Sequence, residues 1–216
     1  MSTPEYSQTL SINYLPIKWK NGFEKWDLVR FSTPMDGNCL FHAISNSYFE
    51  PYRKQSLNGK PMSRRKMVRQ LRTELSEKLA AKVDENKSDS PRYYDLLNYG
   101  NTAIFAKGVS EFSLEHMQSM LDSEQQIGYG YLEFLCESLN KDIYILEGSR
   151  GDIYNTDELP LMIKGNRRSI VLYYVTGHYE LVGIKNGSDS FDTHFAPDHS
   201  FIRFLNHRVR EIINIS

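Results

Sequence analysis

Cysteine is scarce in this sequence, whose 216 residues include only Cys39 and Cys136. The two are far apart and form no Cys-x-x-Cys pair, which argues against a disulfide framework and favours a reducing compartment. Long apolar runs are also missing, whereas a membrane helix requires roughly 18–20 such residues. Residues 1–20 lack the apolar core of a signal peptide. These absences predict a cytoplasmic protein.

The sequence has no excess of charge of either sign. Lys and Arg number 26, Asp and Glu number 27, and the formal net charge is −1. A nucleic-acid or membrane-surface binder needs a surplus of basic residues, so neither partner is expected. There is no internal repeat and no phosphate-binding glycine loop.

Compact metal-ligand spacing is absent as well. His194, His199 and His207 lie near Asp192 and Asp198, but no pair has the spacing of a zinc site and no cysteine joins them. We therefore predict no metal and no other cofactor.

The apolar content is large enough for a substantial core, with 40% hydrophobic and 12% aromatic residues. A chain of this length most often forms one domain. We predict an N-terminal arm over residues 1–25, a single domain over residues 26–216, and a monomer. Both tryptophans, Trp19 and Trp26, precede the first motif. They either close the core or form a platform beside the site.

Helical patterns dominate the first half of the chain and strand patterns the second. Helices are expected at 37–50, from a Ser63 cap to about 83, from a Ser113 cap to about 121, at 127–139, and from about 198. Strands are expected at 142–146, 169–175 and 178–184. This order predicts an α+β fold with a small central sheet flanked by helices. On the second helix, Arg64, Arg65, Arg69 and Arg72 are assigned to a solvated polar face.

Residues 34–44 carry the first chemical motif, a turn that leads into an apolar helix. Gly37 and Asn38 tolerate positive φ, and Cys39 falls at the junction with the helix. The unpaired N–H groups of a first helical turn favour a thiolate over a thiol. The same groups can receive the oxyanion that forms when a thiolate attacks a carbonyl. Cys39 is therefore a candidate nucleophile.

Residues 177–184 offer a base for this nucleophile. They alternate as a strand, so His178 and Glu180 project from the same face and a carboxylate could orient the imidazole. Asp36 is a second candidate for a supporting role. His42 is closer to Cys39 in sequence, but its place on the helix points it away from the thiol. Cys136 lies among apolar residues and is interpreted as an inert core thiol.

These two stretches resemble the ovarian tumour (OTU) family of cysteine proteases, which are deubiquitinases. The first hallmark of the family, Asp-Gly-x-Cys followed by an aromatic-rich helix, is matched at residues 36–41. The second, a strand that begins His-Tyr, is matched at residues 178–180. Residues 128–146 are similar to the family's helix-then-strand segment, with Tyr129 where the family more often has Trp. The resemblance covers roughly residues 30–185.

The resemblance implies a papain-like OTU fold and hydrolysis of isopeptide bonds at the C-terminus of ubiquitin or of a ubiquitin-like modifier. It implies an acyl-enzyme on Cys39, His178 as general base and a catalytic role for Asp36. Gly37 and Asn38 would supply the oxyanion loop. The partner would be ubiquitin or polyubiquitin, held through its narrow basic tail by acidic groups such as Glu111, Glu115 and Asp122.

Two alternatives remain open at this point. One is a catalytically silent module that keeps the fold and binds ubiquitin; the other is a papain-like peptidase or acyltransferase with an unrelated substrate. The long basic helix and the aromatic C-terminal tail are most similar to OTU-type proteins of large DNA viruses, which implies the host cytoplasm. Aromatic residues between 93 and 112 form either core or a protein-docking surface.

Overall fold

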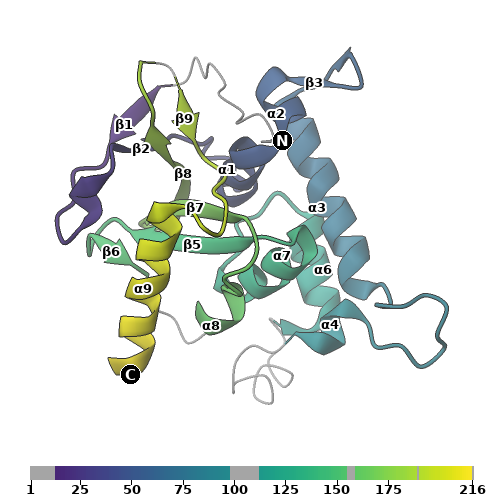
Figure 1. Cartoon of the computed structure of the whole chain (residues 1–216). Helices are drawn as coiled ribbons and strands as arrows, with labels where there is room; N and C mark the ends of the chain where they lie inside the picture. Colours follow the sequence, from purple (N-terminus) through teal and green to yellow (C-terminus); the bar gives the residue numbers. More distant parts are fainter. Residues whose placement is uncertain (1–12, 98–111, 155–158, 189, 216) are drawn as a thin grey trace, which may run out of the picture.

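A computed structural model describes residues 13–97, 112–154, 159–188 and 190–215. Within these residues a mixed sheet of seven strands lies at the centre, in the order β1-β2-β8-β7-β5-β6 with β9 paired to β8 (Figure 1). β5 and β7 are parallel, and the other pairs are antiparallel. The strands are β1 (Tyr14–Pro16), β2 (Leu28–Phe31), β5 (Asp142–Glu147), β6 (Asp152–Ile153), β7 (Ser169–Val175), β8 (His178–Lys185) and β9 (Phe191–Asp192).

Helices cover both faces of this sheet, and two of them begin at the predicted caps. The Ser63 hydroxyl accepts from the N–H of Lys66 at 3.3 Å, and the Ser113 hydroxyl from that of His116 at 3.2 Å. The helices are α1 (Cys39–Tyr48), α2 (Glu50–Lys54), α3 (Arg64–Ala80), α4 (Tyr93–Leu96), α6 (Leu114–Asp122), α7 (Leu132–Leu139), α8 (Leu159–Met162) and α9 (Ser200–Ile215), with 3-10 turns η1 (Phe23–Lys25) and η4 (Tyr129–Tyr131) and a small hairpin of β3 (Ser56–Leu57) and β4 (Lys60–Pro61).

The strand β2 is a feature that the sequence pattern did not reveal. It pairs antiparallel with β8, with Leu28 opposite Ile184 and Phe31 opposite Leu181. Leu28, Val29 and Phe31 are all buried, so β2 lacks the polar alternation of a half-exposed strand. This pairing joins a segment just before the Cys39 turn to the strand that begins with His178.

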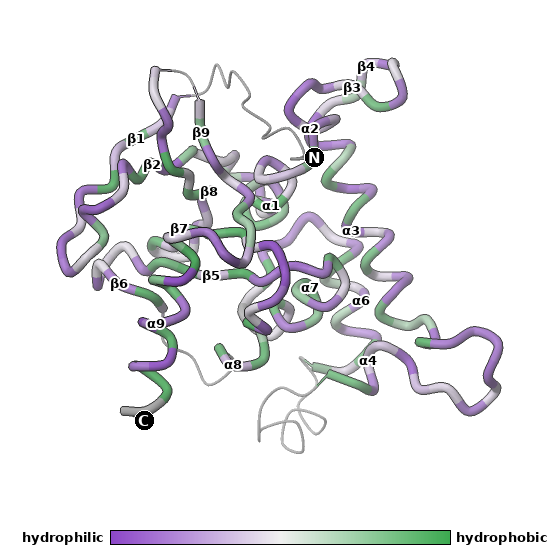
Figure 2. Tube along the Cα trace, in the orientation of Figure 1, coloured by the Kyte–Doolittle hydropathy of each residue, from purple (hydrophilic) through white to green (hydrophobic). Residues whose placement is uncertain are grey.

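The two faces of the sheet contact different layers. Tyr179 and Leu181 of β8 belong to the same apolar cluster as Cys39, whereas Val182 and Ile184 belong to the cluster under α9. The alternation predicted for this strand is therefore confirmed, although both of its faces are buried. Figure 2 shows β5 at the centre as largely hydrophobic and the loop after α3 as largely hydrophilic.

Both tryptophans lie in the cluster under α9. Trp26 stacks at 5.0 Å from both Phe201 and Phe204, and Trp19 lies 5.2 Å from Phe23. Because Cys39 belongs to the other cluster, the tryptophans close the core and are not a platform beside the site.

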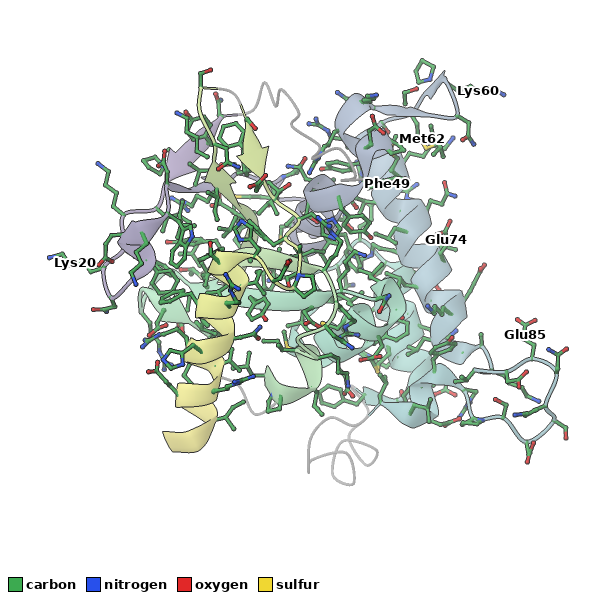
Figure 3. All side chains as sticks on the ribbon, viewed as in Figure 1. Lys20, Phe49, Lys60, Met62, Glu74 and Glu85 are labelled. Atoms are coloured by element: carbon green, nitrogen blue, oxygen red, sulfur yellow. The ribbon has the colours of Figure 1, made fainter. Side chains whose placement is uncertain are left out.

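The periphery consists of polar connections. In Figure 3, Lys60 extends outward from the β3–β4 hairpin, and Lys20 and Glu85 extend outward from two loops. β1 pairs with β2, so residues 14–16 belong to the sheet. The division into an arm and a domain at residue 26 stays a prediction, and residues 1–12 lie outside the described residues. In the part of the chain that is described, no helix is both long and apolar enough to cross a membrane.

Candidate active site

The turn before α1 is held in place from two sides. Asp36 Oδ1 accepts from the backbone N–H of Asn38 at 3.0 Å, and the Asn38 amide donates to the Asp36 carbonyl at 3.3 Å. Gly37 has a φ of 80°, which a side chain disfavours. A Cβ at this position would also collide with the carbonyl oxygen of Glu124. Glycine is therefore required both for the turn and for the close approach of the neighbouring loop.

Cys39 is the first residue of α1 and is 4% exposed. Burial is the largest influence on the thiol and raises its pKa, whereas hydrogen bonds from the N–H groups of Tyr179, Leu40 and Cys39 itself lower it. The net pKa lies above the usual cysteine value, so burial outweighs the helix start that was expected to favour a thiolate. The thiol is therefore protonated at neutral pH and requires a base to react.

His178 follows a tight turn between β7 and β8. Thr176 and Gly177 have φ values of 46° and 80°, and His178 then begins β8 opposite Val175. The backbone of Tyr179, the next residue, hydrogen-bonds to the sulfur of Cys39. The fold thus places the nucleophile candidate and the base candidate at adjoining ends of α1 and β8.

Thr33 is the hydrogen-bond partner of His178. Its Oγ1 lies 3.2 Å from His178 Nε2 and 2.5 Å from the Tyr179 carbonyl oxygen. Sequence analysis did not single out this residue. Its only sequence signal is its place before Pro34, and its proximity to His178 follows from the pairing of β2 with β8.

Glu180 is engaged elsewhere. Its Oε2 accepts from Arg30 Nη1 at 2.9 Å, and the carboxylate is buried. The Arg30 guanidinium also lies 4.9 Å from the centre of the Tyr173 ring. Among the described residues, Arg30 is the hydrogen-bond partner of the Glu180 side chain. Glu180 and His178 lie on the same face of β8, but Glu180 is hydrogen-bonded to Arg30.

Asp36 forms a chain of hydrogen bonds with two buried residues. Its Oδ2 lies 3.1 Å from His42 Nε2, and His42 Nδ1 lies 2.8 Å from the Tyr52 hydroxyl. Burial lowers the pKa of His42, although Asp36 opposes that change. Partial burial raises the pKa of Asp36, but hydrogen bonds from Asn38 and His42 bring it below its usual value. The neutral ring therefore donates to the carboxylate through Nε2 and accepts from Tyr52 through Nδ1.

This chain gives His42 a supporting place in the site. Both of its ring nitrogens are occupied, and the ring is 1% exposed. It cannot approach Cys39 as a base without breaking these bonds. The sequence expectation that His42 points away from the thiol agrees with this geometry.

Arg72 is a correction to the predicted polar face of α3, because it is 2% exposed. Its guanidinium donates to Asn38 Oδ1 at 2.9 Å and packs 4.6 Å from the Phe41 ring centre. Burial lowers its pKa to about 10. Its other acceptors are the carbonyl oxygens of Met120, Leu121 and Gln125. Arg72 therefore ties the turn at residues 36–38 to the end of α6.

The segment after α6, residues 123–126, is the bridging loop. Glu124 accepts from Arg65 and from Arg69, the latter at 2.7 Å, so these two arginines of the predicted solvated face are paired. The amide of Gln126 donates to the Gly177 carbonyl. The bridging loop thus connects α3 with the turn before His178 and passes against the Gly37 turn.

The remaining candidates lie apart from this cluster. Glu115 and Asp122 are on exposed positions of α6, and Glu111 lies outside the described residues. Cys136 is fully buried, and burial raises its pKa well above the usual range. No group of three or more His, Cys, Asp or Glu in the described ranges is arranged to hold a metal ion.

The comparisons with known proteins agree with this architecture. The family described as OTU-like cysteine protease matches residues 34–179, which is more than half of the chain. The chain therefore belongs to the OTU family of cysteine proteases. No curated protein matches the sequence significantly.

Several solved structures resemble the chain. An ovarian tumour (OTU) domain in complex with ubiquitin has 19% identity and a TM-score of 0.53, over 92% of this chain and 90% of that chain. The OTUD1 OTU domain has 20% identity and a TM-score of 0.41, over 72% and 85%. The viral OTU domain protease from Dera Ghazi Khan virus has 17% identity and a TM-score of 0.42, over 83% and 99%. The first of these establishes the α+β OTU fold that the sequence predicted.

Proposed function

We propose that this protein is a deubiquitinase that hydrolyses isopeptide bonds at the C-terminus of ubiquitin through an acyl-enzyme on Cys39. The observation that carries the proposal is the placement of the Cys39 thiol, which lies at the start of α1 and against the backbone of the residue after His178. Membership of the OTU cysteine proteases and the likeness to an OTU domain in complex with ubiquitin support the substrate.

The first step is proton transfer from the Cys39 thiol to His178. Because burial keeps the thiol protonated, the imidazole acts as general base as the sulfur attacks the carbonyl carbon of the scissile bond. The product is a tetrahedral intermediate with a negative oxygen and an imidazolium. The thiol was neutral, whereas the oxygen of the intermediate carries a negative charge. The oxyanion must therefore be stabilised at this step.

The oxyanion is stabilised by the start of α1. The Asn38 N–H is bonded to Asp36, so in this proposal Gly37 and Asn38 shape the loop. The N–H of Cys39, which faces its own sulfur in the free protein, turns to the oxygen as the sulfur attacks. Asp36 acts here as the residue that fixes the loop. Its carboxylate is held by Asn38 on one side and His42 on the other.

Breakdown of the intermediate completes the cycle. The imidazolium of His178 gives its proton to the leaving lysine amine, and the acyl group stays on Cys39 as a thioester. His178 then takes a proton from water as hydroxide adds to the thioester carbonyl. The C–S bond breaks, ubiquitin leaves with a free C-terminal carboxyl group, and the imidazolium returns its proton to the Cys39 thiolate. No cofactor takes part in this scheme. The same proposal assigns the protein to a reducing, cytoplasmic setting as a monomer.

The test is covalent capture by ubiquitin that carries a C-terminal propargyl group. The wild-type protein is expected to form an adduct of one ubiquitin, and Cys39→Ala to form none. Cys136→Ala is the matched control, because it removes the other buried thiol and should leave the adduct intact. The absence of an adduct, with Cys39 still alkylated by iodoacetamide, would contradict ubiquitin as the substrate. The absence of both reactions would favour the silent ubiquitin-binding module.

A further inference from the structure

The hydroxyl of Thr33 has two neighbours but only one hydrogen. Oγ1 lies 2.5 Å from the carbonyl oxygen of Tyr179 and 3.2 Å from His178 Nε2. A carbonyl oxygen can only accept, so the Thr33 hydrogen belongs to the bond with Tyr179. The Thr33 oxygen must then accept from His178, and Nε2 must carry a hydrogen.

This arrangement fixes the tautomer of the neutral imidazole. With hydrogen on Nε2, the lone pair is on Nδ1, and Nδ1 is the nitrogen that can take the proton of Cys39. After that transfer both nitrogens carry hydrogen, and the bond from Nε2 to Thr33 becomes a charge-assisted one. The same contact therefore serves His178 before and after it accepts the proton.

The carboxylates that the sequence offered for this place are occupied. Glu180 is bonded to Arg30 at 2.9 Å, and Asp36 is bonded to His42 at 3.1 Å. We propose that Thr33 is the positioning residue of His178, a neutral hydroxyl in the place where sequence analysis expected a carboxylate. This inference rests on the proposed role of His178 and goes beyond it by naming what orients the ring.

The pairing of β2 with β8 places Thr33 there. β2 ends at Phe31, which is opposite Leu181, and two residues further on Thr33 reaches the level of Tyr179. The following residue is Pro34, which restricts Thr33 to extended backbone. The strand pair that carries the base therefore also carries its partner, so the two move as one unit.

The direct test is the tautomer of His178 in the free protein. Protein with ¹⁵N-labelled histidine is examined by long-range proton–nitrogen NMR, which distinguishes Nε2–H from Nδ1–H. Wild type and Thr33→Ser are expected to show Nε2–H, and Thr33→Val to show a mixture. An Nδ1–H ring in wild type would overturn the proposal, and this measurement needs neither substrate nor a variant.

The kinetic test uses turnover of diubiquitin by the same variants. Thr33→Val should lower kcat about tenfold with little change in KM, the loss expected for one hydrogen bond that matters in the transition state, and Thr33→Ser should restore it. Thr193→Val is the matched control, since it removes a buried threonine hydroxyl that bonds to the Ser47 carbonyl and should leave kcat unchanged. Equal kcat for Thr33→Val and wild type would overturn the proposal.

A failure of the proposed function can be told apart from a failure of this inference. If wild type does not turn over diubiquitin, the rate of Cys39 alkylation by iodoacetamide replaces kcat as the readout. A Thr33→Val protein that is alkylated about tenfold more slowly supports the positioning role whatever the substrate. Alkylation at the wild-type rate contradicts it, and the tautomer of the wild-type ring decides if the valine variant does not fold.

Discussion

The two faces of the central sheet are built from different kinds of residue. Under α9 the contacts are between rings, with Trp26 packed against Phe201 and Phe204. Under α1 and α3 the core includes charged and polar side chains, and Arg72 and His42 are exposed by only 2% and 1%. The α9 side of the sheet is mainly apolar, with the Glu180 carboxylate and the Tyr144 hydroxyl as paired polar groups, whereas the other side buries a guanidinium and an imidazole among its core residues.

The two faces contribute differently, one mainly to the stability of the fold and the other mainly to the geometry of the site. Aromatic burial contributes free energy but tolerates small shifts of position. Buried polar groups contribute little net free energy, yet each one is costly unless its donors and acceptors are matched, so they fix geometry. The face that holds Cys39 is therefore specified by hydrogen bonds, and the α9 face supplies much of the apolar stabilisation. Four predictions follow the comparison from the largest effect to the smallest.

Replacing the buried guanidinium should damage both stability and activity. Arg72→Met keeps an unbranched side chain but leaves Asn38 Oδ1 and three carbonyl oxygens without their donor. We expect a loss of about 3–5 kcal/mol in the free energy of unfolding, measured by urea denaturation. The rate of ubiquitin-propargyl capture per folded molecule should also fall at least tenfold. Arg69→Met on the exposed face of α3 is the control. An equal effect of that substitution would contradict the role of Arg72 in tying Asn38 to the end of α6.

Removing a ring from the α9 face should affect stability alone. Phe201 is fully buried, so Phe201→Ala is expected to cost about 3–5 kcal/mol through lost burial and a cavity. Capture by ubiquitin-propargyl, corrected for the folded fraction, should stay at the wild-type rate. A drop in that corrected rate similar to that of Arg72→Met would erase the distinction between the two faces.

Acid should destabilise the protein partly through His194. Burial and the neighbouring Arg168 and Lys141 lower its pKa from 6.5 to about 3, so the folded state holds the ring neutral. Between pH 6.5 and 3 the unfolded state binds the proton more readily, and stability is lost as the pH falls through this window. His194→Gln should flatten the stability curve between about pH 6 and pH 4. Parallel curves for the two proteins, followed by urea denaturation, would contradict this assignment.

The smallest effect is expected at the bridging loop. Hydrogen bonds from Arg65 and then Arg69 lower the pKa of Glu124 to about 2, but all three side chains are solvent-accessible. Glu124→Gln should lower the melting temperature slightly at low salt, and the difference should vanish near 1 M NaCl, where the Debye length is about 3 Å. A difference that persists at high salt would show that the Glu124 carboxylate contributes more than charge attraction to Arg65 and Arg69.

Local signals in the sequence were sufficient for the nucleophile turn and the helix caps. Gly37 predicted the turn and has the expected positive φ, whereas Asn38 has a φ of −109° and contributes through its hydrogen bonds to Asp36. Ser63 and Ser113 predicted the helix starts. The alternation around His178 predicted β8, whose two faces contact different clusters. These features depend on neighbours within a few residues, so the sequence alone is sufficient to predict them.

The hydrogen-bond partners of the site residues depend on contacts between distant segments. Local sequence patterns therefore do not predict them. Helical periodicity assigns Arg72 to the polar face, and only the position of α6 turns that residue into a buried clamp. Strand periodicity assigns Glu180 to the same face as His178, but Arg30 on the neighbouring strand binds it first. Thr33 has no motif of its own, because its role is set by the register of β2 against β8.

That register also determines when the site can form during synthesis. Leu28 pairs with Ile184, so the strand that leads into the Cys39 turn waits for a partner that leaves the ribosome much later. Closing so long a loop is entropically costly and slow compared with forming α1 or α3. A nascent chain with α1 and α3 already folded therefore holds a β2 strand whose β8 edge is unpaired, and its Cys39 thiol lacks the backbone of Tyr179 beside it. In the proposed mechanism, Cys39 can therefore become reactive only after β8 has been made.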